Sequence, residues 1–238
     1  MKQNNQNTIS YETLQLTGEQ RTLFDQLLML LTDKNRQVNL TAITDPQEIR
    51  EKHFADSLAV ILCGKAAEKL QCGAKVLDLG TGGGFPALPI KIVWPDTDMT
   101  MLDATKKKLA AVGEISDTLG LKNAQTLWGR AEELAQQPEY RASFDLVVSR
   151  AAMYLPALIE CAIPFLKEGG MLIAYKQGSN DDEIDASSHA LNELNARITD
   201  KVPYLLADDS RRLVVIEKTG ATPAKYPRRP GKPVKNPL

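Results

Sequence analysis

From Lys75 to Glu217 the chain alternates short runs rich in aliphatic and β-branched residues with longer segments of helical periodicity. A strand followed by a helix and a second strand forms a parallel pair, so this alternation predicts an α/β, doubly wound, mostly parallel sheet with helices on both faces. The last two runs are joined by a short connection, residues 207–210, and are expected to pair antiparallel. The seven predicted strands cover residues 75–79, 99–103, 124–128, 144–149, 171–175, 198–205 and 211–217. The main helices predicted between them cover 105–119, 155–166 and 182–196.

The part of the chain before these strands has helical patterns only. Thr17 and Gln20 have the spacing of a capping box, and leucines at helical spacing follow them. Asp45 followed by Pro46 is typical of a helix start, so a second helix is predicted from there to about Cys63. Residues 1–10 are rich in Asn and Gln and are expected to form a frayed tail. We therefore divide the chain into a helical extension (1–72), a sheet domain (73–220) and a C-terminal tail (221–238).

The C-terminal tail combines prolines with basic residues and contains no acidic residue. Prolines at this density are expected to exclude helix and central strand, which leaves an extended basic ribbon. Composition alone is compatible with a solvated tail. The alternative is an arm that contacts phosphate groups, for which the candidate residues are Arg228, Arg229, Lys232 and Lys235.

Composition excludes several classes of protein. The 238 residues are 43% hydrophobic and 25% charged with a net charge of −1, which is typical of a globular protein and not of a disordered one. The longest apolar run, residues 58–63, is far shorter than the roughly 20 residues of a membrane helix, so we expect no membrane partner and a cytoplasmic location. Three cysteines without a CxxC pair argue against a disulfide framework, and neither His53 nor His189 has the neighbours of a metal ligand.

The strongest local motif is VLDLGTGGGFP at residues 76–86, where a predicted strand runs into a glycine-rich turn. Such a turn lets the backbone approach a ligand closely. The dinucleotide fingerprint requires a small residue at its sixth position, but counting from Gly80 the sixth residue is Phe85. The spacing of Gly80, Gly82 and Gly84, with Asp78 at the end of the strand, therefore favours S-adenosylmethionine over a pyrophosphate.

Asp103 ends the next predicted strand. An acid at this position reaches the crevice of a doubly wound sheet, where its two oxygens can accept both ribose hydroxyls of a nucleoside. The alternative is that Asp103 caps the predicted helix over 105–119. With the glycine loop, Asp103 indicates a nucleoside cofactor, and the sheet is expected to be of the class I S-adenosylmethionine-dependent methyltransferase type.

Together these motifs resemble one family, the bacterial ribosomal RNA small subunit methyltransferase G family, also called the glucose-inhibited division protein B family. The similarity extends over nearly the whole chain from about Thr17. Its stretches are NLTAI (39–43), KHFADSL (52–58), VLDLGTGGGFP (76–86), DATKKK (103–108), GRAEE (129–133), SRA (149–151), YKQG (175–178), YPRRPGKP (226–233) and the final PL. The combination is far more specific than a glycine-rich loop alone.

The resemblance implies methylation of a guanine N7 in the decoding-region 530 loop of 16S rRNA, with S-adenosyl-L-methionine as the cofactor. It implies 16S rRNA or the 30S subunit as partner, and nothing in the sequence requires more than a monomer. Gly84 and Thr105 are small departures from the family pattern. The residues expected at the cofactor are Asp78, Gly80, Gly82, Gly84, Phe85, Asp103, Ala104, Thr105, Ala131, Glu132 and Arg150.

Guanine N7 carries a lone pair at neutral pH, so its methylation needs no general base, and we assign no proton-transfer residue. Positioning of the reacting atoms is expected to do the work. His53, Asp56, Arg150 and Lys176 are the candidates for contact with guanine, and Lys176 also for contact with phosphate. For His53 the alternative is packing against the domain with a hydrogen bond to Asp56, and for Arg150 it is a structural ion pair.

Other functions remain open at this stage. A methyltransferase acting on a small molecule or a protein would keep the glycine loop and Asp103 but leave the basic tail without a role. A non-catalytic ribosome assembly factor would keep the cofactor crevice only as a vestige. A nicotinamide dehydrogenase is disfavoured by Phe85 and by the lack of a paired proton donor.

Overall fold

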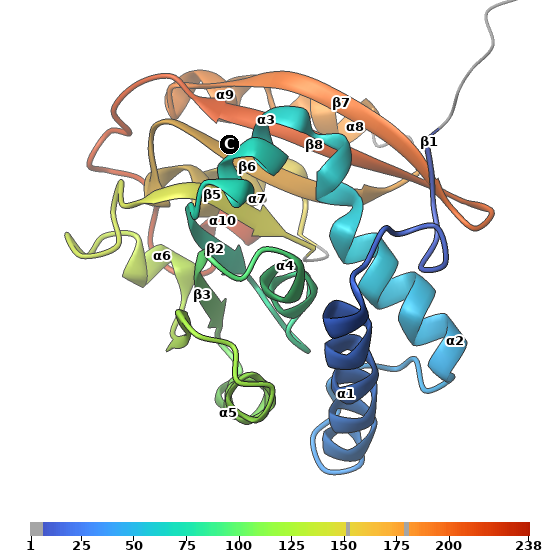
Figure 1. Ribbon diagram of the computed structural model, residues 1–238. Coiled ribbons are helices and arrows are strands. Elements are labelled where there is room, and N and C mark those ends of the chain that lie inside the picture. Colours follow the sequence, from blue (N-terminus) through green and yellow to red (C-terminus); the bar gives the residue numbers. More distant parts are fainter. Residues whose placement is uncertain (1–6, 151–152, 179–180) are drawn as a thin grey trace, which may run out of the picture.

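The computed structural model describes residues 7–150, 153–178 and 181–238, which form an α/β fold around a mixed eight-stranded sheet (Figure 1). The strand order is β1-β7-β8-β6-β5-β2-β3-β4. The strands are β1 (Asn7–Ile9), β2 (Lys75–Leu79), β3 (Asp98–Asp103), β4 (Ala124–Trp128), β5 (Phe144–Ser149), β6 (Leu166–Gln177), β7 (Ala196–Leu206) and β8 (Asp209–Lys218). The sheet is mostly parallel, as predicted, and β8 runs antiparallel to both of its neighbours, β6 and β7.

The prediction of seven strands was wrong by one. Residues Asn7–Ile9 lie within the segment expected to be frayed, but they form β1, which pairs in parallel with β7 at the edge of the sheet. A three-residue strand is too short to show an alternating pattern in its own sequence. Its stability comes from pairing with the neighbouring strand. The rest of the predicted tail, residues 1–6, lies outside the described residues.

Helices cover both faces of the sheet, as the alternation of strands and helices predicts. Neighbouring residues of one strand face different cores: Val76 packs with the N-terminal helices, whereas Leu77 packs with α7. The helices are α1 (Gly18–Asn35), α2 (Pro46–Ile49), α3 (Gly64–Gln71), α4 (Ala87–Val93), α5 (Lys106–Thr118), α6 (Ala131–Leu134), α7 (Leu155–Ala162), α8 (Asp181–Ala186), α9 (Ser188–Glu193) and α10 (Lys232–Lys235). Three further helical segments are the π-helix η1 (Arg50–Ala55) and the 3-10 helices η2 (Leu58–Leu62) and η3 (Ile163–Phe165).

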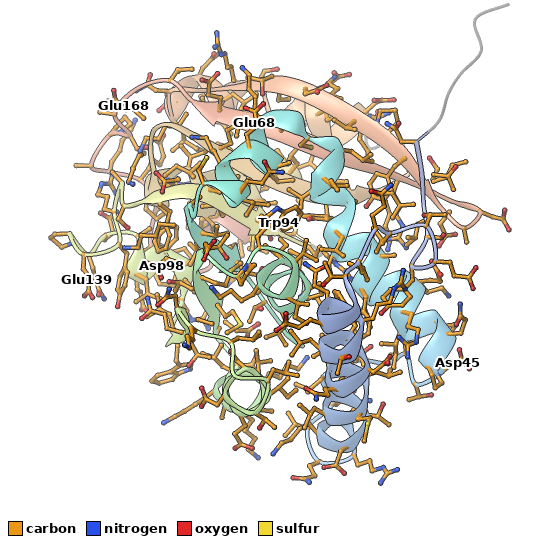
Figure 2. The ribbon with its side chains drawn as sticks, in the orientation of Figure 1. Asp45, Glu68, Trp94, Asp98, Glu139 and Glu168 are labelled. Atoms are coloured by element: carbon orange, nitrogen blue, oxygen red, sulfur yellow. The ribbon has the colours of Figure 1, made fainter. Side chains whose placement is uncertain are left out.

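Both predicted helix starts in the N-terminal part are confirmed. The Thr17 hydroxyl accepts from the Gln20 amide and the Gln20 side chain accepts from the Thr17 amide, which is a complete capping box. Asp45 accepts from the Glu48 amide, and Figure 2 shows Asp45 at the start of α2. The second helix is not regular, however, because it continues as a π-helix and then a 3-10 helix. The Arg150 guanidinium, which is distant in sequence, donates to the carbonyls of Lys52 and His53 in the π-helical part.

The C-terminal tail is not the extended ribbon that its prolines predict. It packs along the domain and contains a helical turn, α10, which contacts α7. Pro233 fits there because it lies in the first turn, where backbone N–H groups have no partner inside a helix. Arg141 donates to the carbonyls of Thr222, Pro223 and Tyr226, and the buried Tyr226 donates its hydroxyl to Glu193.

Two features are absent from residues 7–150, 153–178 and 181–238. No helix among them is both long and apolar enough to cross a membrane. Within the same ranges, no group of three or more His, Cys, Asp or Glu side chains could hold a metal ion.

Candidate cofactor and nucleic-acid site

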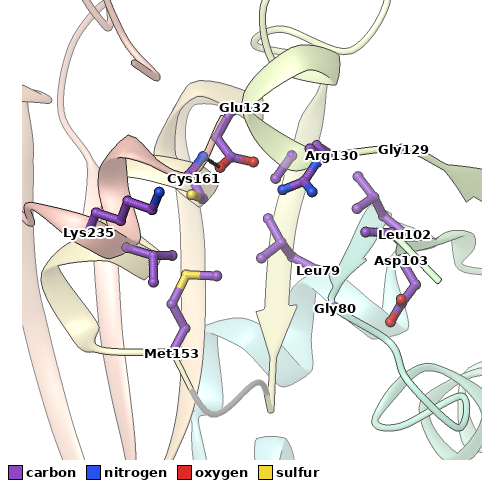
Figure 3. Close-up of a pocket in the computed structure, with 14 residues that line it drawn as sticks. Leu79, Gly80, Leu102, Asp103, Gly129, Arg130, Glu132, Met153, Cys161 and Lys235 are labelled. Atoms are coloured by element: carbon purple, nitrogen blue, oxygen red, sulfur yellow. Dashed lines mark hydrogen bonds between the residues drawn. The ribbon is translucent and has the colours of Figure 1, made fainter. Parts of the chain in front are cut away.

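The site lies at the point where the order of the strands changes direction across the sheet. Strand β2 is flanked by β3 on one side and β5 on the other, and ligands of doubly wound sheets bind at the carboxyl end of such a strand. A cavity of about 400 Å³ opens there, beside Gly80 (Figure 3). It brings together five of the predicted cofactor residues, namely Gly80, Asp103, Ala104, Ala131 and Glu132. Its volume falls within the usual range of small-molecule pockets, about 300–1,000 Å³.

The glycine loop has a backbone that only glycine adopts readily. Gly82 and Gly84 have φ values of 56° and 91°, in the left-handed region. A Cβ atom at Gly84 would also lie 2.5 Å from the Leu88 side chain of α4. The loop is therefore folded tightly against α4. Replacement of Gly82 or Gly84 by a residue with a Cβ atom is expected to lower stability.

Replacement of Gly82 by alanine is expected to lower the free energy of unfolding by about 1–2 kcal/mol, because a Cβ atom disfavours the left-handed conformation. Urea denaturation measures the change. Gly18→Ala is the matched control, since a Cβ at Gly18 meets nothing within 4 Å. Equal stability of the Gly82→Ala and Gly18→Ala variants would contradict the argument.

Most of the loop's N–H groups are already bonded within the protein. Gly80 and Thr81 donate to the Leu102 carbonyl at 2.9 and 3.0 Å, and Gly84 and Phe85 donate to the Thr81 carbonyl. The Gly82 amide donates to Asp103 at 2.9 Å. A pyrophosphate site needs free backbone N–H groups that point at the ligand. This loop therefore offers little to a diphosphate, which agrees with the argument from Phe85.

Asp103 holds the loop and faces the cavity at the same time. Its Oδ2 accepts from the Gly82 amide, and its Oδ1 accepts from the Thr105 amide at 2.7 Å, next to the start of α5. The interpretation of Asp103 as the cap of this helix was wrong, because the N-cap of α5 is Thr105 and Asp103 accepts from the amide of Thr105 itself, not from an amide of the first helical turn. A carboxylate has about four acceptor positions, so two remain for a ligand in the cavity that Asp103 lines.

Asp78 lies beneath the loop and does not line the cavity. It is fully buried, and its Oδ2 accepts from the Thr81 hydroxyl at 2.7 Å and from the Ala87 amide at 3.1 Å. Its Oδ1 has no hydrogen-bond partner within the described ranges. Burial raises the pKa of Asp78 to about 7, against the opposing effect of its hydrogen bonds and of the Arg150 charge.

Arg150, at the end of β5, joins the sheet to the N-terminal helical segment. Its Nη1 donates to the His53 carbonyl and the Ser57 hydroxyl, and it forms an ion pair with Asp56 at 3.2 Å. The guanidinium also lies 5.9 Å from the centre of the Phe85 ring. The structural ion pair expected as the alternative for Arg150 is therefore present.

His53 packs against the glycine loop through Phe85. The two rings stack with centroids 4.6 Å apart. Because a guanidinium can only donate, His53 Nδ1 accepts from Arg150, and Nε2 then donates to the Thr41 hydroxyl at 2.6 Å. The predicted bond from His53 to Asp56 is replaced by these contacts. Burial and the Arg150 charge lower the pKa of His53 to about 4, so the ring is neutral at physiological pH.

Asp56 belongs to a buried network and does not face open solvent. Only 2% of the residue is exposed. Its Oδ1 accepts from the Tyr204 hydroxyl at 2.6 Å, and its Oδ2 lies 3.2 Å from Arg150 and 3.8 Å from Arg211. Asp56 is thus placed where a guanine cannot reach it without opening the core.

Two predicted RNA contacts are also engaged within the protein. Lys176 is buried and donates to the Met153 carbonyl and to Glu183, both at 2.6 Å. Arg228 forms a two-pronged ion pair with Glu160, whose side chain is fully buried. By contrast, Arg229 and Lys235 are exposed.

Several residues of this region were not predicted. Glu160 holds the tail, and Met153 and Cys161 line the cavity. Glu160 carried one signal, since a carboxylate in the otherwise apolar helix α7 requires a buried partner. Met153 and Cys161 carried none, because an apolar side chain in a core and one in a pocket look alike in sequence.

The fold is of the α/β methyltransferase-like type, as the similarity to two solved structures shows. MtNAS in complex with MTA and tNA has a similar fold (TM-score 0.56, 11% identity, 85% of this chain and 75% of that chain). A putative O-methyltransferase from Klebsiella pneumoniae is similar too (TM-score 0.55, 15% identity, 82% and 90% covered).

Closer relatives define the family. The family model GidB, described as rRNA small subunit methyltransferase G, matches residues 20–213. Ribosomal RNA small subunit methyltransferase G of Streptococcus gordonii is 40% identical over 97% of this chain and 96% of its own. The Lactococcus lactis protein of the same name is 39% identical over 94% of each. The chain belongs to the rRNA small subunit methyltransferase G family.

Proposed function

We propose that this chain transfers a methyl group from S-adenosyl-L-methionine to the N7 atom of a guanine in the 530 loop of 16S rRNA, acting in the cytoplasm. One structural observation supports this most: the glycine loop uses its own N–H groups internally while Asp103 still faces the cavity. That combination suits a nucleoside without a diphosphate. Family membership supplies the class of substrate.

The residues at the cavity fit this cofactor. Leu79 gives the cavity an apolar wall for a purine, and the two remaining acceptor positions of Asp103 suit a ribose diol. When bound, the cofactor supplies a methyl group attached to a positively charged sulfur. Asp78, also expected at the cofactor, is fully buried below the loop and does not line the cavity, so its role is proposed to be support of the loop.

The protein groups are proposed to act by positioning. Guanine N7 needs no deprotonation, and His53, whose pKa is about 4, is not a cation near pH 7 and so cannot act there as an imidazolium acid. His53, Phe85 and Arg150 form a rigid cluster, in which the ring stack and the ion pair fix each side chain. Holding reacting atoms about 3–3.5 Å apart can contribute on the order of 7–11 kcal/mol.

For the RNA we propose phosphate contacts by the exposed Arg229 and the half-buried Lys232. Arg228 and Lys176 are proposed to contribute through the fold, because their charges are already paired. RNA affinity is then expected to fall steeply with salt.

The test is transfer of labelled methyl groups from the cofactor to 16S rRNA and to 30S subunits, followed by mapping of the modified base. We expect label on one guanine N7 of the 530 loop, and none on RNA in which that guanine is replaced by adenine. Label on protein or on small molecules alone would favour a methyltransferase that acts on a small molecule or a protein. Cofactor binding without any transfer would favour an assembly factor.

A further inference from the structure

The C-terminal segment, residues 221–238, forms one wall of the cavity. Gly231, Val234 and Lys235 line it together with Glu132 and Cys161. In Figure 3, Lys235 lies across the cavity from Asp103, with Leu79 and Arg130 between them. The tail is therefore placed at the same pocket as the glycine loop, although almost the whole sheet domain separates the two in sequence.

The wall is held in place from both ends. The Gly231 amide donates to Glu132 Oε1 at 2.8 Å, at the start of α6. Arg228 donates through its backbone and its side chain to the buried Glu160 of α7, and through Nη2 to the Asn236 carbonyl. These contacts enclose α10 on both sides, so its position relative to the cavity is determined by buried and charged anchors.

The side chains that this wall presents are suited to the purine half of the ligand. Val234 is 58% exposed and lines the cavity, so its apolar side chain is accessible to a ligand there. Lys235 adds an ammonium group, which can only donate. An apolar surface beside a donor matches a purine ring with its acceptor nitrogens, at the end of the cavity away from the ribose-type acid Asp103.

We propose that the C-terminal segment is part of the cofactor site, with Val234 and Lys235 contacting the purine of S-adenosylmethionine. This inference rests on the proposed function and deepens it. It changes the expected role of Lys235 from RNA contact to cofactor contact.

The test measures the affinity for S-adenosylhomocysteine by isothermal titration calorimetry, without RNA and without turnover. Lys235→Met is expected to weaken binding about 10-fold, because it removes a hydrogen bond from a charged donor. Val234→Asp is expected to weaken it at least as much, because it places a carboxylate against the purine. Lys225→Met is the matched control: it removes the same charge from the same segment, but Lys225 pairs with Glu193 away from the cavity.

Each outcome decides the matter. The proposal is supported if Lys235→Met and Val234→Asp bind weakly while Lys225→Met binds like the wild type, all three with wild-type melting midpoints. It is overturned if all variants bind equally well, if the two lysine variants lose affinity equally, or if Lys235→Met affects only RNA binding. If the wild type itself does not bind S-adenosylhomocysteine, the proposed function is overturned as well. If the wild type binds it and the variants bind equally well, only the role of the C-terminal segment is overturned.

A truncation after Pro230 gives a second measurement, because it removes α10 and leaves the Arg141 anchors in place. Loss of affinity with a cooperative melting transition supports the proposal. Unchanged affinity overturns it, and if the truncated chain does not fold, the point variants decide.

Discussion

Replacement of Asp56 by alanine is expected to lower the free energy of unfolding by about 3–5 kcal/mol, because it removes the buried carboxylate that pairs with Arg150, whose side chain is only 16% exposed. Asp56 faces two guanidinium groups, Arg150 and Arg211, and accepts from the Tyr204 hydroxyl. The measurement is urea denaturation of the wild type and the variant. A loss of this size from a site first considered for guanine contact would identify Asp56 as a structural residue.

The chain provides a matched control for Asp56. Asp25 also pairs with an arginine, Arg50, at 2.7 Å, but 61% of its side chain is exposed. Asp25→Ala is therefore expected to cost less than about 1 kcal/mol. Asp56→Asn keeps an acceptor for Tyr204 and is expected to lie between the two. A loss for Asp56→Ala no larger than that of the control would show that the network is not what joins the N-terminal helices to the sheet.

The second large effect concerns the pH dependence of stability through Asp78. Its pKa is about 7 in the folded protein against 3.8 for the unperturbed group. Between these values the folded protein keeps a proton that the unfolded chain releases, so stability falls as the pH rises through this window. At 1.36 kcal/mol per pKa unit, the unfolding free energy is expected to fall by on the order of 4 kcal/mol through this window, and the loss is complete above about pH 7.

The Asp78→Asn variant isolates this effect, since it keeps an acceptor for Thr81 and Ala87 but does not ionise. From pH 4 to pH 8, the unfolding free energy of the wild type is expected to fall relative to that of the variant. Asp117→Asn, an exposed position on α5, is the control and should leave the pH profile unchanged. A constant difference between Asp78→Asn and wild type over this range would contradict the assignment.

Much of the fold could be predicted because its signals are local. The strands β2, β4 and β5 begin and end at the residues expected for them, and the two helix caps form as predicted. Each signal lies within a few residues of the structure it specifies: an apolar run ends at a turn, or a capping side chain reaches an amide three positions on. The glycine loop is of the same kind, since its conformation depends on residues that lack a Cβ atom.

The errors have the opposite origin. Arg150 donates to a carbonyl of the π-helix η1, Glu160 and Arg141 bond the tail, and β7 pairs with β1. Each of these contacts joins segments that are far apart in sequence. The predicted helix over 182–196 is likewise divided into α8 and α9, which pack separately against α7.

The same division applies to the site. Sequence was sufficient to indicate a nucleoside pocket at the end of the first two strands of the sheet domain, because the loop and the acid that follow those strands are local features. It was not sufficient to assign the charged residues. A basic side chain can bind phosphate only if no carboxylate within the protein has already paired with it, and the pairing of Arg228 with Glu160 or of Arg150 with Asp56 exists only once distant segments have packed together.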